Sequence, residues 1–298
     1  MDPAREGIRA FAPEYASPGR KALIEEADRL HRSALRILAY LFLCLIYVLV
    51  TARILGTIGL RNPFLPPFLG ITFATWTAVR FFDRGRLRDL GLYWGPERLA
   101  DLALGLLLPL GLMTGILAAE WTAGWLLVAG IRAEVAPLLA DFWGFALVAW
   151  YEELFARGYL LQTLLRVVPP RAACFLSALV FAGLHAANPE ASVPALFGIF
   201  LAGVVLGSGC LATGSLYLPM AFHFSWNFFQ AFFGFPVSGR VFPGLLQLVR
   251  EGPPLLTGGR FGPEGGVLGF IALLAAWTAI RFHSGKFSSA APSGPGPL

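Results

Sequence analysis

Residues 142–165, FWGFALVAWYEELFARGYLLQTLL, combine a strongly apolar segment with three charged side chains. The segment is long enough to cross the hydrocarbon core of a bilayer, which takes about 20 residues of α-helix. A charged side chain at mid-membrane costs about 2.5–3.5 kcal/mol, whereas a leucine returns only about 0.5 kcal/mol. Glu152, Glu153 and Arg157 therefore require mutual pairing or a wet cavity, and such intramembrane charges indicate a functional site.

The composition of the whole chain predicts a membrane protein. Of its 298 residues, 56% are hydrophobic and only 14% are charged, whereas soluble domains carry about 25% charged residues. The apolar runs are continuous rather than alternating, which favours helices over strands. We therefore predict an all-α, polytopic helical membrane protein whose first partner is the lipid bilayer. The formal net charge of +5 does not indicate nucleic-acid binding.

About eight transmembrane helices are predicted along the chain. They cover residues 35–58, 64–82, 99–119, 138–165, 172–187, 194–212, 216–234 and 265–283. Eight crossings put both ends of the chain on one side of the membrane. The basic residues before the first span, together with Arg281 and Lys286 after the last, place that side in the cytoplasm by the positive-inside rule.

The remaining segments are predicted to lie outside the bilayer core. These are an amphipathic cytoplasmic segment at 1–34, a Gly- and Pro-rich external loop at 235–264 and a disordered tail at 284–298. Residues 121–131 are too short to cross and are expected to lie in the interface or to re-enter. GLLQLV, residues 244–249, suggests a short interfacial helix. Residues 35–137 form a first group of spans, and 138–234 hold the polar residues.

Helix geometry separates the three charges of the opening segment. Glu153 and Arg157 are four residues apart with the acid first, the favoured order for an ion pair on one helix face. Glu152 is rotated by about 100° from Glu153. We therefore expect Arg157 to neutralise Glu153, whereas Glu152 needs a partner from another helix.

Two histidines and an amide supply candidate partners for Glu152. His185 ends the span at 172–187, and His223 and Asn227 lie one helical turn apart in the span at 216–234. A single intramembrane histidine often only bridges two helices, but polar groups on three separate spans predict a polar site within the bundle. By residue count, His185 lies near the outer end of its span and His223 nearer the inner end of its own.

The chemistry of such a site has two readings. Glu152 and an imidazole sharing a water molecule form a general base, while a second imidazole and Asn227 hold the oxyanion of a tetrahedral intermediate. Alternatively, Glu152, His185 and His223 bind zinc, which activates water. The residues alone fit both. A proton-coupled transporter is a further alternative, because buried Glu and His side chains also carry protons.

Three motifs extend this reading. EELFAR (152–157), FAGLH (181–185) and HFSWN (223–227) have the forms EExxxR, FxxxH and HxxxN, in that order on successive spans. Over residues 138–234 the chain resembles the CPBP family of intramembrane proteases, which includes type II CAAX prenyl endopeptidases and bacterial Abi or bacteriocin-immunity proteins. The resemblance implies a catalytic core at 138–234 in a bacterial inner membrane, and cleavage of a peptide or protein substrate, lipidated or membrane-embedded.

The resemblance also implies a role for each polar residue. Glu152 would be the water-activating base and His185 its partner, His223 and Asn227 the oxyanion or ligand pair, and Glu153 and Arg157 their support. Members are commonly described as metalloproteases, and a metal-free glutamate mechanism is the alternative, so zinc on Glu152, His185 and His223 stays open. A non-catalytic immunity or scaffold protein would keep the same fold.

Overall fold

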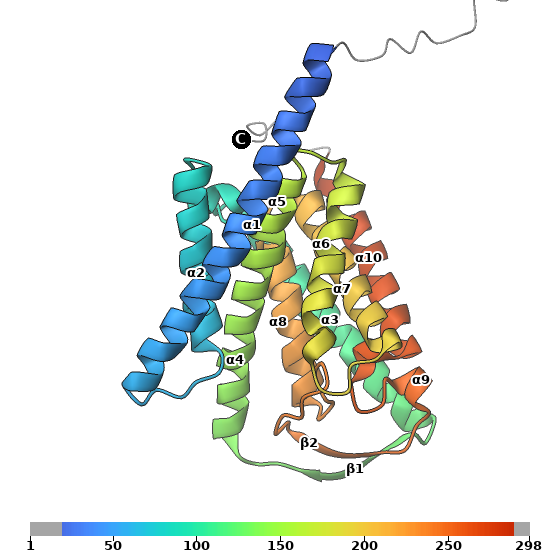
Figure 1. Ribbon diagram of the computed structural model, residues 1–298. Helices are drawn as coiled ribbons and strands as arrows, with labels where there is room; N and C mark the ends of the chain where they lie inside the picture. The colour runs from blue at the N-terminus through green and yellow to red at the C-terminus, as the bar shows by residue number, and fades with distance from the viewer. Residues whose placement is uncertain (1–19, 289–298) are drawn as a thin grey trace, which may run out of the picture.

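Apolar helices run side by side along most of the chain in the computed structural model, which describes residues 20–288 (Figure 1). Each predicted span coincides with a helix, and the all-α membrane class is confirmed. The long helices of the bundle are α1 (Arg20–Thr57), α2 (Leu65–Thr77), α3 (Glu97–Thr122), α4 (Val135–Glu153), α6 (Pro170–Leu184), α7 (Val193–Thr213), α8 (Tyr217–Phe232) and α10 (Val267–Ser288).

Four of these segments are long and apolar enough to cross a membrane by themselves. They are Leu23–Thr57, Glu97–Thr122, Pro170–Ala187 and Val193–Thr213. The other apolar helices are shorter or are interrupted by irregular turns. α10 runs to Ser288, beyond its predicted end at residue 283, and the remainder of the predicted tail, like residues 1–19 of the predicted N-terminal segment, lies outside the described residues.

Two helices continue through π-helical turns. α2 leads into η2 (Ala78–Phe82), and α4 leads into η4 (Leu154–Leu160) and then α5 (Leu161–Leu164). A π turn adds a residue to the helical turn and is frequently found at functional sites. The turn η4 begins directly after Glu153, so the opening sequence segment is irregular at the position of its charges.

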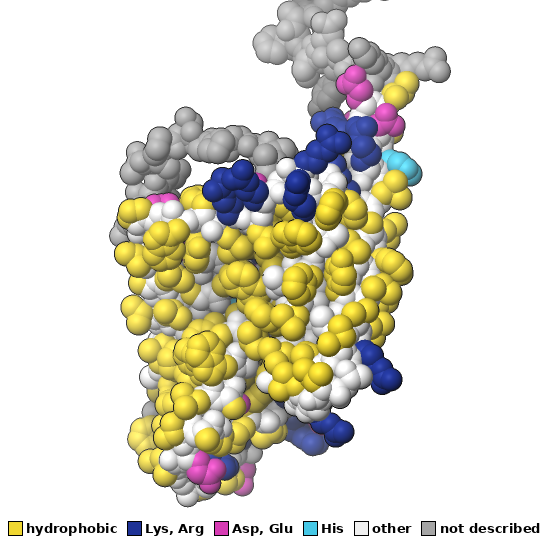
Figure 2. Space-filling model, turned by 90° about the vertical axis from the view of Figure 1, so that its left-hand side faces the viewer, with side chains coloured by type: hydrophobic (Ala, Val, Ile, Leu, Met, Phe, Trp, Pro, Cys, Tyr) yellow, Lys and Arg dark blue, Asp and Glu magenta, His cyan; other side chains and the backbone are white. Residues whose placement is uncertain are grey.

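The two ends of the bundle differ. α1 begins and α10 ends at one end, where Lys and Arg side chains gather beyond an apolar surface; we call it the basic end (Figure 2). The 3-10 turn η3 (Leu87–Leu90) also lies there. At the other end, strands β1 (Leu126–Ile131) and β2 (Leu246–Arg250) run across the bundle; we call it the sheet end.

This sheet corrects one expectation. β1 and β2 pair antiparallel, with Leu126 opposite Arg250 and Ile131 opposite Leu246. Residues 126–131 therefore form an extended strand, and the interfacial helix expected at 244–249 is wrong. The reason is tertiary: each strand satisfies the other's backbone groups, which neither short segment could do alone in an apolar setting. The loop also contains the short helical turns α9 (Pro254–Thr257) and η6 (Pro263–Gly265).

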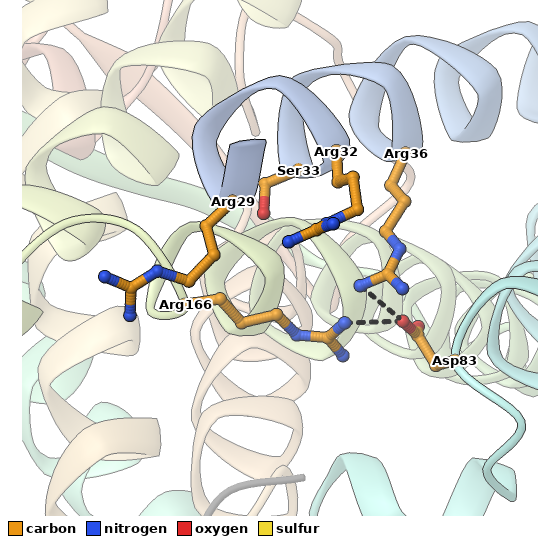
Figure 3. Close-up of a pocket in the computed structure, with 6 residues that line it drawn as sticks. All are labelled: Arg29, Arg32, Ser33, Arg36, Asp83 and Arg166. Atoms are coloured by element: carbon orange, nitrogen blue, oxygen red, sulfur yellow. Dashed lines mark hydrogen bonds and ion pairs between the residues drawn. The ribbon is translucent and has the colours of Figure 1, made fainter. Parts of the chain in front are cut away.

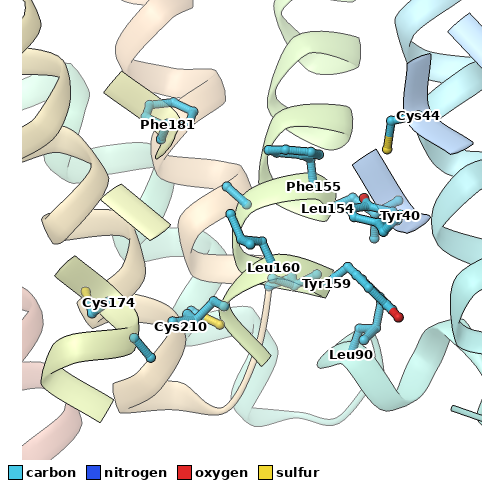
Figure 4. Close-up of a cluster of buried hydrophobic side chains, with 14 of the residues drawn as sticks. Tyr40, Cys44, Leu90, Leu154, Phe155, Tyr159, Leu160, Cys174, Phe181 and Cys210 are labelled. Carbon is cyan, nitrogen blue, oxygen red and sulfur yellow. The ribbon is translucent and has the colours of Figure 1, made fainter. Parts of the chain in front are cut away.

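Close helix packing holds the bundle together. α3 packs along α8, α1 along α2, and α6 along α7. A Cβ atom on Gly203 of α7 would lie 2.8 Å from the Cβ of Ala178 on α6, so the two helices approach as closely as a glycine permits. One buried apolar cluster joins α1 to the π turn η4 through Tyr40 and Tyr159, whose ring centroids are 4.3 Å apart (Figure 4).

Candidate active site

The buried ion pair expected within the opening segment is present. Arg157 Nη1 donates to Glu153 Oε1 over 2.7 Å, and both side chains are fully buried. Arg157 Nη2 donates to the carbonyl oxygen of Gly203, 3.0 Å away on α7. The guanidinium group also lies 4.4 Å from the centroid of the Phe181 ring. Arg157 therefore ties α4 and η4 to both α6 and α7.

Glu153 has a second role that the sequence did not indicate. Its Oε1 atom lies 2.9 Å from His223 Nδ1. An ionised carboxylate only accepts hydrogen bonds, so Nδ1 of His223 is the donor and carries the proton. This contact fixes the imidazole ring and turns its Nε2 atom toward Glu152. Glu153 and His223 are 70 residues apart in the chain, and no spacing rule relates them.

Glu152 is held differently from its neighbour. Its Oε2 atom lies 3.8 Å from His185 Nε2 and 3.8 Å from His223 Nε2. That oxygen is buried and has no hydrogen-bond partner. The distances exceed a direct hydrogen bond and suit groups that share one water molecule. The structure thus brings Glu152, His185 and His223 together, with two imidazoles facing one unpaired carboxylate oxygen.

His185 is oriented by its own helix. It follows the last residue of α6 and opens the short 3-10 turn η5 (His185–Ala187). Its Nδ1 atom lies 2.8 Å from the carbonyl oxygen of Phe181, one turn earlier. Because a carbonyl only accepts, Nδ1 donates and Nε2 is left as an acceptor toward Glu152.

Phe181 lies beside the polar residues of the cluster, a contact that the sequence analysis did not predict. Its ring lies 4.7 Å from the His185 ring and 6.0 Å from the His223 ring, measured between centroids. It also carries the Arg157 guanidinium on its face. One aromatic side chain thus contacts three polar residues of the cluster. In the sequence, its position in FAGLH, four residues before His185, is the feature that indicates contact with that histidine.

Asn227 is placed beside the cluster but not within it. It lies one turn after His223 on α8 and is partly buried. Among the described residues, no hydrogen-bond partner is found for its amide. The side chain is therefore available to a bound molecule, whereas the contacts between Glu152, His185 and His223 form without it.

The difference in depth expected between His185 and His223 does not keep them apart, because both imidazoles lie 3.8 Å from Glu152 Oε2. Before α8, the Leu216 backbone N–H donates to the Gly91 carbonyl oxygen over 3.0 Å, so the turn before α8 packs against η3. A Cβ atom on Gly91, which has a φ of +93°, would lie 3.0 Å from Gly214 O.

The donor atoms lie farther apart than they would around a bound tetrahedral zinc ion. A tetrahedral zinc ion at about 2.0–2.1 Å from each ligand would hold neighbouring donor atoms about 3.4 Å apart, less than the 3.8 Å from Glu152 to each histidine. Within the described part of the chain, no three His, Cys, Asp or Glu side chains are arranged to hold a metal ion. The geometry therefore gives the zinc reading no support.

Comparison with known proteins locates a family within the chain. Residues 134–229 match the family model described as "Type II CAAX prenyl endopeptidase Rce1-like". The matched region nearly coincides with the core predicted at 138–234 and includes all six polar residues discussed above. No curated protein matches the chain.

Proposed function

Because the chain belongs, through residues 134–229, to the CAAX protease family of membrane endopeptidases, we propose that it hydrolyses a peptide bond with a water molecule activated by Glu152. One observation carries the proposal. The buried Oε2 atom of Glu152 has no hydrogen-bond partner while two imidazole nitrogens face it at 3.8 Å. A buried polar atom without a partner costs about 1–3 kcal/mol, and a bound water or substrate removes that cost.

Glu152 and His185 act on the water. Both present acceptor atoms to the same point, so a water molecule there donates one hydrogen to each and turns its lone pairs toward a substrate carbonyl. Glu152 takes one proton as the water oxygen bonds to the carbonyl carbon. The proton then passes to the leaving nitrogen, the C–N bond breaks, and a carboxylic acid and an amine are released.

Asn227 and His223 act on the oxyanion of the tetrahedral intermediate. The Asn227 amide is not engaged by the protein and can donate to a negatively charged oxygen. His223 donates from Nδ1 to Glu153; donation to the oxyanion as well requires a second proton on Nε2, which would make His223 an imidazolium paired with Glu153. Glu153 and Arg157 are positioning residues in this scheme, because they hold His223 without touching the substrate.

The setting of the reaction follows from the apolar surface of the bundle. We propose that the substrate is a peptide or protein that reaches the site from the bilayer, lipidated peptides included. We further propose that the basic end faces the cytoplasm of a bacterial inner membrane, because arginine and lysine gather there.

The test is peptide cleavage by the purified full-length protein in liposomes. Glu152→Gln keeps the shape of the side chain and removes the base, so kcat should fall by about 10²–10⁴ with an unchanged melting temperature. Glu251→Gln, an exposed acid of the loop, is the matched control and should cleave normally. A pool of prenylated and unmodified peptides, with products identified by mass spectrometry, serves as substrate.

Two outcomes would contradict the proposal. Full cleavage by the Glu152→Gln variant would remove Glu152 from the reaction. No cleavage by the unaltered protein, together with proton flux across the liposome, would favour a transporter, and the absence of both would favour a scaffold. Adding a chelator tests the metal separately: we expect cleavage to continue, and a loss restored by zinc would assign the ion to Glu152 and the histidines.

A further inference from the structure

A pocket at the basic end lies away from the polar cluster just described. Its volume is about 350 Å³, and it is lined by Arg29, Arg32, Ser33, Arg36, Asp83 and Arg166 (Figure 3). The first four belong to α1, Asp83 follows η2, and Arg166 follows α5. Segments distant in the sequence therefore bring four guanidinium groups and one carboxylate to one place.

The single carboxylate leaves half of these guanidinium groups unpaired. Asp83 Oδ1 lies 2.6 Å from Arg166 Nη1 and 3.4 Å from Arg36 Nη1, and Arg36 also donates to the Phe82 carbonyl oxygen. Arg29 and Arg32 have no hydrogen bond or ion pair with the described part of the chain. The pocket thus has two arginines fixed by Asp83 and two that are exposed and available to a ligand.

The chemistry of the lining selects one class of ligand. All four cations are arginines, whose planar guanidinium groups match the oxygens of a phosphate with paired hydrogen bonds. The four guanidinium groups repel one another, and the single carboxylate offsets only part of that repulsion. A bound anion reduces the remainder. Basic residues commonly gather at one end of a membrane protein without forming a site; here they converge on a cavity from two sides.

The position of the pocket indicates the source of the phosphate. Directly after Arg36, α1 exposes large apolar side chains, among them Leu38 and Phe42, each 63% exposed. The arginines therefore lie at the boundary between an apolar surface and a charged one, the level at which lipid head groups lie (Figure 2). We propose that this pocket binds a phosphate group, supplied by the head group of an anionic lipid.

Native mass spectrometry of the full-length protein tests the proposal. The protein is taken from nanodiscs of phosphatidylcholine alone, of phosphatidylcholine with phosphatidylglycerol, or of phosphatidylcholine with added inorganic phosphate. Retention of bound ligand and the melting temperature are compared with those of Arg29→Gln/Arg32→Gln. The control, Arg86→Gln/Arg88→Gln, removes two exposed arginines near η3, which do not line the pocket.

The unaltered protein should retain phosphatidylglycerol and melt at a higher temperature with it. Loss of two arginines should weaken retention about 100-fold, because a hydrogen bond between charged groups contributes about a factor of ten or more. The control should retain the lipid. A rise in melting temperature with inorganic phosphate alone would support the site and assign it a soluble phosphate. Equal retention by both double variants and the unaltered protein, or equal loss in both, would overturn the proposal.

Discussion

The polar cluster in the middle of the bundle and the loop at the sheet end both bury carboxylates, yet they satisfy them in opposite ways. In the loop, Glu264 accepts from the Ser238 backbone N–H over 2.6 Å and also contacts the Gln230 amide. Glu120 accepts hydrogen bonds from Arg250 Nε and Nη2, each over 3.2 Å. In the cluster, Glu152 Oε2 has no hydrogen-bond partner among residues 20–288.

This difference separates carboxylates that join elements of the fold from the one for which we propose a role in the reaction. Glu264 and Glu120 each join elements that would otherwise be independent: the loop to α8, and α3 to β2. Glu153 belongs with them, because its Oε1 atom is shared by Arg157 and His223. Glu152, adjacent in the chain, differs because two imidazole nitrogens face its Oε2 atom at 3.8 Å, too far for a direct hydrogen bond. A buried oxygen without a partner does not by itself single out Glu152, because Glu153 Oε2 also has none among the described residues; the two facing imidazoles do.

Replacing Glu153 should have the largest effect on stability. Glu153→Ala leaves the Arg157 guanidinium buried and uncompensated, which costs about 3–5 kcal/mol, and the melting temperature should fall strongly. The double variant Glu153→Leu/Arg157→Leu removes both charges and should recover most of this stability. Its kcat should stay low with little change in KM, because His223 has lost the group that orients it.

That double variant also tests the assignment of Glu153 as a positioning residue. Recovery of both melting temperature and kcat would mean that the ion pair is purely structural. Low kcat in a well-folded double variant would show that orienting His223 matters for turnover.

The next effect concerns pH and the loop. Burial raises the pKa of Glu264 to about 7, partly opposed by its hydrogen bonds to Ser238 and Gln230. Because the folded pKa lies above the unfolded value, this carboxyl favours the folded loop most below about pH 4.5, and that contribution is lost as the pH rises through about 7. The change should be at most about 3 kcal/mol. Hydrogen exchange of residues 235–265 between pH 5 and 8 measures it.

Glu264→Gln cannot titrate and should flatten this pH dependence. Glu251→Gln, which alters an exposed acid of the same loop, should retain it. An unchanged pH profile in the Glu264→Gln variant would show that another group in the loop is responsible.

The smallest effect is expected at Glu120. Its partner Arg250 also donates to the carbonyl oxygens of Thr257 and Gly259, each over 2.9 Å, and lies over the Phe235 ring. Glu120→Ala therefore leaves the guanidinium partly satisfied, and the cost should be about 1–3 kcal/mol. Thermal unfolding measures the loss. Since Glu120 lies at the far end of α3, kcat should not change; a fall comparable to that of the Glu153 variants would contradict the division between loop and cluster.

Local rules predicted much of this arrangement. The apolar runs located the helices, and the four-residue spacing located the Glu153–Arg157 pair, because both depend only on nearby residues. Small residues allow close helix packing by the same kind of local rule, and Gly203 and Gly207 of α7 face Ala178 and Cys174 of α6.

The remaining features depend on distant parts of the chain. The strand pairing of Leu126 with Arg250 joins segments that each look like short interfacial pieces. The contact between His223 and Glu153 joins α8 to the end of α4 across 70 residues of the chain. The spacing of residues within one segment does not predict a contact with a distant segment, so neither the strand pairing nor the His223–Glu153 contact could be predicted from spacing.

The π turn that follows Glu153 has a consequence for residues with no reactive groups. All seven of its residues, Leu154–Leu160, are buried, so neither lipid nor solvent can bond to its stretched backbone, and only the surrounding side chains keep it open. Tyr40, packed on Tyr159, is one of these. Small changes in such remote apolar neighbours should shift Glu152 against the histidines, so under the proposed mechanism we expect side chains that never meet the substrate to alter the turnover rate.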